Sequence, residues 1–113
     1  MQVNFKSLIE NDHMTKKIVE NDVKILICDY FIDDQVDRVN VLIEKNKMRV
    51  KTKICFHGIY NINVTASGND SSQSFYNALY VAEKKLRKKI KVHSTSKLNA
   101  YRTYYGEPHY DYR

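Results

Sequence analysis

The chain has 113 residues, of which 42% are hydrophobic and 28% charged, a composition typical of one globular domain and unlike that of a disordered segment. Its first residues lack the basic and apolar regions of a signal peptide, and its apolar runs fall far short of the roughly 20 residues that a membrane span needs. We therefore expect a cytoplasmic protein with no membrane partner. The formal net charge of +6 directs attention to an acidic partner.

The first half of the chain predicts a strand, a helix and further strands. Residues 2–6 alternate apolar and polar side chains, which predicts a short strand. Residues 15–31 repeat apolar side chains at helical spacing, and Thr15 is a suitable N-cap. Three further alternating runs predict an antiparallel meander with one face buried: 38–44, 48–56 and 60–66, with turns expected at 44–48 and 57–58.

A second helix is predicted after the small and polar residues 67–71. Asp70 and Gln73 have the spacing of a capping box. The apolar stripe that follows consists of Phe75, Leu79, Ala82, Leu86 and Ile90. The order βαβββα predicts an α+β fold, in which two helices pack on one face of a four-stranded, mainly antiparallel sheet, as in double-stranded-RNA-binding domains. We expect this domain to span residues 1–93 and a Tyr-rich C-terminal tail to span residues 94–113.

Positive charge is concentrated in the second half of the last predicted helix. Residues 82–93 hold six Lys or Arg against one Glu, a net charge of +5 in a chain whose total is +6. Like charges on neighbouring turns repel, so such a block favours a polyanionic partner. A solvated face that offsets the helix dipole is the alternative. The candidate RNA-binding residues of this helix are Lys84, Lys85, Arg87, Lys88, Lys89 and Lys91.

Two other groups of residues are weaker candidates for the same role. The predicted strands carry further candidate RNA-binding cations, although strand lysines can also simply deter edge-to-edge aggregation: Arg38, Arg49, Lys51 and Lys53. The tail holds side chains that could stack on unpaired bases, pack on the domain or remain loose: Tyr101, Arg102, Tyr104 and Tyr105. Nucleic acid is favoured over a membrane because the apolar helix face is needed to cover the sheet and Trp is absent.

Signals for catalysis are absent from the sequence. Glu10 and His13 have Glu-x-x-His spacing, but di-metal sites need that motif twice. Three glycines do not make a phosphate-binding loop, and Cys28 and Cys55 lack a metal-ligand or redox spacing. We expect a protein that is not an enzyme and has no catalytic residues, metal, cofactor or small-molecule substrate.

The stretch VTASGNDSSQSFYNAL, followed by KKLRKKI, resembles the family of ribosome hibernation-promoting factors and ribosome-associated inhibitors. In that family a similar small-residue segment leads into a helix that opens with an apolar residue, a Tyr, and then Ala and an aliphatic residue, here FYNAL at 75–79. The family's Lys-Leu-x-Arg-x-Leu pattern is similar to KLRKKI at 85–90. The resemblance covers about residues 1–93 and matches its basic positions to Lys85 and Lys88.

The resemblance implies ribosome hibernation as a stress response. Such a protein binds 16S-type rRNA of the small ribosomal subunit, in the mRNA and tRNA channel between head and body. It blocks mRNA and the A- and P-site tRNAs, inhibits translation and protects idle ribosomes. Only about 20 residues follow the last predicted helix, which implies a short-type member. Two alternatives stay open: a stand-alone double-stranded-RNA-binding module, and a protein-interaction adaptor acting through the Tyr-rich tail.

Overall fold

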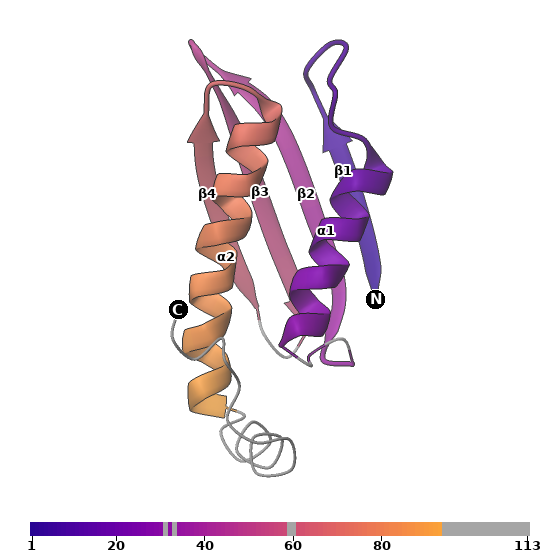
Figure 1. The fold of residues 1–113 in the computed structure, drawn as a ribbon, viewed down its shortest axis with the longest axis vertical. Coiled ribbons are helices and arrows are strands. Elements are labelled where there is room, and N and C mark those ends of the chain that lie inside the picture. The colour runs from indigo at the N-terminus through magenta and orange to yellow at the C-terminus, as the bar shows by residue number, and fades with distance from the viewer. Residues whose placement is uncertain (31, 33, 59–60, 94–113) are drawn as a thin grey trace.

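The computed structural model describes residues 1–30, 32, 34–58 and 61–93, and only the backbone of the last four of these. Its elements follow the order βαβββα (Figure 1): β1 (Gln2–Ser7), α1 (Lys16–Asp29), β2 (Val36–Asn46), β3 (Arg49–Gly58), β4 (Ile62–Gly68) and α2 (Ser71–His93). The predicted fold class is confirmed. Neither α1 nor the described part of α2 has the length and apolarity that crossing a bilayer requires.

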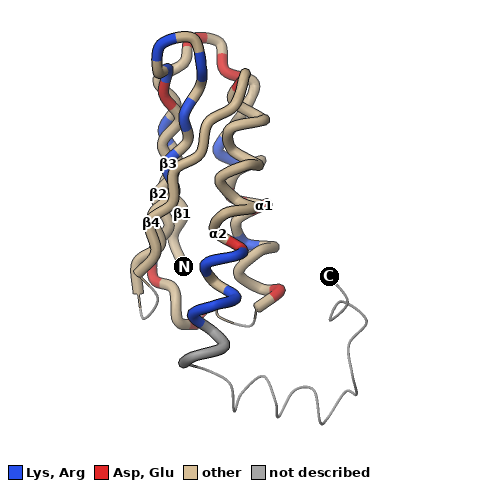
Figure 2. Tube along the Cα trace, turned by 90° about the vertical axis from the view of Figure 1, so that its left-hand side faces the viewer, with Lys and Arg blue, Asp and Glu red and all other residues tan. Residues whose placement is uncertain are grey.

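The strands form one sheet in the order β1-β2-β3-β4. β1 pairs with β2 in parallel, whereas β2 with β3 and β3 with β4 are antiparallel, so the sheet is mainly antiparallel as predicted. The connection from β1 through α1 to β2 places α1 on one face, and α2 returns across the same face (Figures 1 and 2). The other face of the sheet remains open.

The core lies between the sheet and the two helices. Each strand sends alternate side chains into it, which is what the period-two pattern predicts. The largest fully buried side chains come from all parts of this layer: Phe56, Phe75, Ile27, Ile32, Ile43, Ile54, Leu86, Val19, Val23 and Val39.

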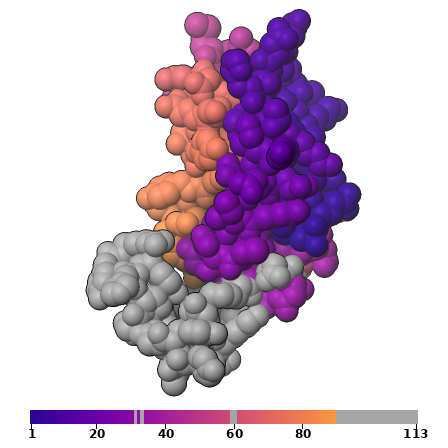
Figure 3. Space-filling model, turned by 45° about the vertical axis from the view of Figure 1, so that its right-hand side comes forward, coloured from indigo at the N-terminus to yellow at the C-terminus, as the bar shows by residue number. Residues whose placement is uncertain are grey.

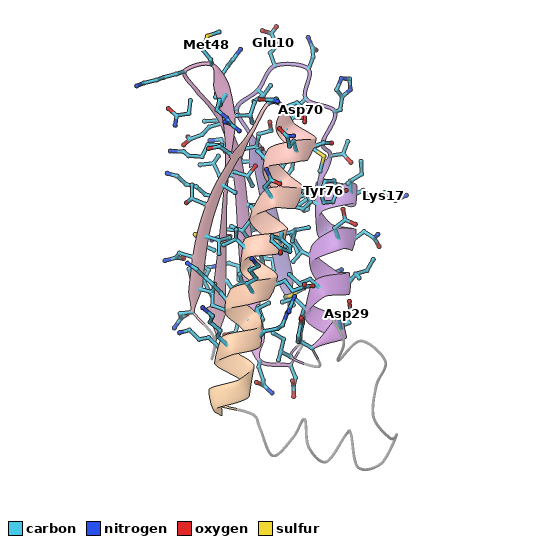
Figure 4. The ribbon with its side chains drawn as sticks, turned by 60° about the vertical axis from the view of Figure 1, so that its left-hand side comes forward. Glu10, Lys17, Asp29, Met48, Asp70 and Tyr76 are labelled. Carbon is cyan, nitrogen blue, oxygen red and sulfur yellow. The ribbon has the colours of Figure 1, made fainter. Side chains whose placement is uncertain are left out.

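The β2–β3 hairpin is tighter than the sequence predicts. Asn46 pairs with Arg49, so the turn contains only Lys47, which has a positive φ of 60°, and Met48. Met48 is 93% exposed at the hairpin tip (Figure 4), and its expected place in the buried row of β3 is therefore wrong. The alternation of apolar residues continued into the turn without burial behind it. At the other end, Gly58 still pairs with Val36, so the turn predicted at 57–58 is also wrong.

The beginning of α2 is fixed to the sheet by close contacts. A Cβ on Gly68 would lie 2.5 Å from the backbone nitrogen of Ser74, so only glycine allows this approach. The buried Ser74 hydroxyl lies 2.7 Å from Thr52 Oγ1 of β3 and donates to the Ser71 carbonyl at 3.1 Å. Asp70 accepts a hydrogen bond from the Gln73 N–H at 2.8 Å, which confirms the predicted cap.

The buried face of α2 differs from the predicted stripe at one position. Ala78 is fully buried, whereas Leu79 is only half-buried. The close approach of α2 to β3 and β4 explains the difference, because a small side chain fits between closely packed backbones where leucine does not. Ile90 lies among the residues whose side chains are outside the described part.

Tyr76 connects the two helices. Its hydroxyl donates to Asp22 Oδ2 of α1 at 2.6 Å, and its ring meets buried Phe75 edge-on with centroids 5.1 Å apart. Figure 4 shows Tyr76 directed from α2 towards α1, and Figure 3 shows the two helices side by side on this face. The bond to Asp22, followed by burial, raises the pKa of Tyr76 above its ordinary value of 10.0.

Ser74→Ala should lower the free energy of unfolding by about 1–3 kcal/mol, because the buried Thr52 hydroxyl would lose its acceptor. Urea denaturation monitored by circular dichroism measures the change. The double variant Thr52→Val with Ser74→Ala leaves no unpaired hydroxyl and should recover part of the loss. Equal stability of Ser74→Ala and the unchanged chain would contradict this account.

The Tyr76–Asp22 bond should make the stability difference between the unchanged chain and Tyr76→Phe depend on pH. Since folding raises the pKa of Tyr76, its contribution is fully present below pH 10 and is lost as the pH rises through the raised value. Urea unfolding at pH 8, 10 and 11 should show a difference below about 1 kcal/mol that shrinks with pH. Tyr80→Phe is the matched control, because the structure gives the Tyr80 hydroxyl no hydrogen bond; a constant difference for Tyr76→Phe would contradict the prediction.

Candidate nucleic-acid interface

The basic residues of α2 are displayed because of the way the helix packs. Phe75, Ala78, Ala82 and Leu86 face the sheet, and at about 100° per residue Lys84 and Lys88 must then point away from it. Figure 2 shows Lys and Arg gathered along this second half of α2. The cations whose side chains the structure describes are all exposed, and we call them the α2 cation cluster: Lys84, Lys85, Arg87, Lys88 and Lys89. The side chain of the remaining predicted residue, Lys91, lies outside the described part.

Two lysines of the cluster contact groups of the protein without losing their charge. Lys84 Nζ lies 4.4 Å from the centroid of the Tyr80 ring, a cation–π distance. Lys85 Nζ donates to the Asn63 carbonyl of β4 at 3.0 Å. Neither contact places a negative charge beside the ammonium group, so both remain available to an external anion.

Arg87 is different because its charge is compensated. Its guanidinium donates to Glu83 Oε1 at 2.7 Å and also meets the Tyr30 hydroxyl at the end of α1. The Glu83 carboxylate raises the pKa of Arg87 above its ordinary value. Arg87 therefore contributes less net charge to the cluster than the sequence suggests.

Lys88 and Lys89 form no ion pair or hydrogen bond with any residue that the structure describes. Lys89 follows Ala82 by seven residues and so lies on the sheet side of the helix, yet it is exposed. The reason is that α2 continues past the end of the sheet (Figure 1). These two ammonium groups are the most accessible positive charges of the cluster.

The predicted strand cations lie on the opposite side of the molecule. Since Thr52 and its alternate neighbours face the helices, Arg49, Lys51 and Lys53 face the open side of the sheet. Lys51 and Lys53 lie 3.4 and 3.7 Å from one carboxylate oxygen of Glu44. The strand group is therefore partly neutralised, unlike Lys88 and Lys89.

The open face also carries Arg38, at the end of the sheet away from the hairpin. Arg38 is exposed and pairs in register with His57 of β3. Between Arg38 and the strand lysines the surface is polar: Asn40 accepts a 2.9 Å hydrogen bond from Asn4 and lies 3.3 Å from His57 Nε2. Within the described residues, no three side chains of His, Cys, Asp or Glu come together as a metal site.

The residues predicted to bind RNA thus form two surfaces rather than one. The middle of β3 lies beside Ser74, and Lys88 follows 14 positions later, about 21 Å further along the helix. The strand cations lie near the hairpin and behind the sheet (Figure 2). Tyr101, Arg102, Tyr104 and Tyr105, like the whole predicted tail domain, lie outside the described residues.

Sequence reasoning missed two aromatic side chains beside the α2 cation cluster. Tyr76 and Tyr80 are 47% and 57% exposed on the outer side of α2. Both precede Lys84 at intervals of four residues, which is the signal that could have identified them.

Comparison of this structure with known proteins finds the same fold in two solved structures. One is a ribosomal subunit interface protein from Coxiella burnetii, with a TM-score of 0.61 and 16% identity over 79% of this chain and 97% of that one. The other is the N-terminal domain of Protein Y from Thermus thermophilus, with a TM-score of 0.54 and 12% identity over 77% and 93%. Neither a family model nor a curated protein sequence matches the chain. The chain therefore has the fold of a ribosomal subunit interface protein and of Protein Y.

Proposed function

We propose that this protein is a ribosome hibernation factor that binds rRNA of the small ribosomal subunit through the α2 cation cluster. It occupies the mRNA and tRNA channel between head and body, excludes mRNA and the A- and P-site tRNAs, and so inhibits translation in the cytoplasm. It acts by occupying space and catalyses no reaction. The idle ribosome is protected while the protein is bound.

The observation that carries the proposal is the exposure of Lys88 and Lys89 without an acidic partner among the described residues. Clustered cations cost folding free energy through mutual repulsion, and an array of phosphates reverses that cost. Structured RNA is recognised largely through its shape and phosphates, which a rigid helix braced on a sheet can contact without reading bases.

The ribosome is the favoured source of these phosphates because of the structural likeness. The Coxiella burnetii protein is described as a ribosomal subunit interface protein, and this chain covers 97% of it. An interface between subunits is lined with RNA on both sides, which suits a domain with cations on two opposite faces. The open face, with Arg38, Arg49, Lys51 and Lys53, supplies the second contact in this proposal.

Replacing Lys88 and Lys89 together by Glu should weaken binding to small ribosomal subunits about 10- to 100-fold and make the salt dependence shallower by about two contacts. With about four uncompensated cations in the α2 cation cluster, the unchanged chain should lose about 150-fold in affinity between about 50 and 200 mM salt. Sucrose-gradient co-sedimentation at several salt concentrations measures both effects.

Lys16→Glu with Lys17→Glu is the matched control, because it changes the net charge equally at exposed positions of α1. Its binding should stay close to that of the unchanged chain. Equal losses in the two double variants would show a general charge effect and contradict the assignment to α2. Tight binding of a plain RNA duplex without affinity for ribosomes would instead support a double-stranded-RNA-binding module.

Glu83→Gln tests the compensation of Arg87 in the opposite direction. Removing the carboxylate frees the Arg87 guanidinium and adds one positive charge to the cluster. Affinity for small subunits should rise about threefold to tenfold, and the salt dependence should become steeper by about one contact. Unchanged affinity and salt dependence in the same gradients would show that Arg87 does not face the RNA.

A further inference from the structure

The outer side of α2 presents two tyrosines followed by two lysines. Tyr76, Tyr80, Lys84 and Lys88 recur every four residues, so they lie on successive turns along one side of the helix, and we call them the Tyr-Lys stripe. Single exposed aromatic residues are common on protein surfaces and need no explanation. Here two of them lie one turn apart and lead directly into the α2 cation cluster.

Contacts within the stripe hold the two rings in place. The Tyr76 ring is fixed by Phe75 and by the hydrogen bond to Asp22. The Tyr80 ring has Lys84 Nζ over it at 4.4 Å and yet remains 57% exposed. Rings that are already ordered lose little conformational entropy when a flat ligand packs on them.

The chemistry of the stripe matches an unpaired nucleotide strand. Aromatic rings stack on bases of any sequence, while lysines beside them contact the phosphates of the same strand. Lys84 contributes to both parts, because its ammonium group lies against the Tyr80 ring and next to Lys88 on the following turn. A double helix offers no free base faces along its side, so an unpaired strand is the better ligand.

We propose that the Tyr-Lys stripe binds a single-stranded RNA segment, with Tyr80 stacked on a base and Lys84 and Lys88 on the adjoining phosphates. This inference rests on the proposed function and deepens it, because it assigns single-stranded RNA to one face of α2. Tyr80 is the centre of the site, since its ring is the more exposed of the two and its hydroxyl has no hydrogen bond in the structure.

The chain contains no Trp, which allows a direct test with a reporter at position 80. Tyr80→Trp should lose tryptophan fluorescence when the full chain is titrated with a single-stranded 12-nucleotide oligoadenylate, because the base stacks on the indole. Ile25→Trp is the matched control: Ile25 is 52% exposed on α1, away from the stripe, and its reporter should not respond.

Affinity measurements separate stacking from charge. Tyr80→Leu should weaken binding of the labelled oligoadenylate about tenfold by fluorescence anisotropy, whereas Tyr80→Phe should retain it, because the stack needs the ring and not the hydroxyl. Circular dichroism should show both variants folded, since Tyr80 is not part of the core.

Four results would overturn the stacking site. An unresponsive Tyr80→Trp in the presence of bound oligonucleotide would place the strand elsewhere. Equal oligonucleotide affinity of Tyr80→Leu and the unchanged chain would exclude stacking. Weaker subunit binding by Tyr80→Leu with unchanged oligonucleotide affinity would indicate a ribosomal protein against the ring. Subunit binding without any oligonucleotide binding would also reject the stacking site while leaving the proposed function intact; loss of both would reject the two together.

Discussion

The rest of the structure depends on the contact between the beginning of α2 and the middle of the sheet. Gly68 lets the chain turn so closely that any side chain there would strike the backbone of Ser74. The hydroxyl pair of Thr52 and Ser74 then fixes the helix both along and around its axis. Since α2 is a rigid rod of 23 residues, this anchor decides where side chains several turns later point. The direction of Lys88 is thus set by contacts far from it.

Much of the fold follows from local patterns in the sequence. The alternation in β2, β3 and β4 is strict where one face is buried, and the caps of both helices involve neighbouring residues, so Thr15 and Asp70 were identifiable. The errors lie where local patterns compete with tertiary contacts. Met48 continued an alternation that had nothing to pack against, and Ala78 replaced Leu79 because the helix lies close to the sheet.

The electrostatics of the candidate surfaces was less predictable. The sequence shows which residues carry charge, but the pairing register decides that Glu44 lies opposite Lys51. Likewise the packing of α1 beside α2 brings Tyr30 to Arg87. Such neutralisation depends on residues distant in sequence, and it lowers the weight of three predicted cations while leaving Lys88 and Lys89 untouched. Exposure could be predicted from the apolar stripe, whereas freedom from a partner could not.

The bond from Lys85 to Asn63 has a consequence for how copies of the protein behave together. Asn77 makes a similar contact, donating to the Ser67 carbonyl at 3.0 Å, so two helix side chains occupy outward carbonyls of the edge strand β4. An incoming strand would have to displace both before it could extend the sheet. α2 thereby shields β4 from strand addition, and a cell could accumulate this protein to a high concentration without the sheets joining edge to edge.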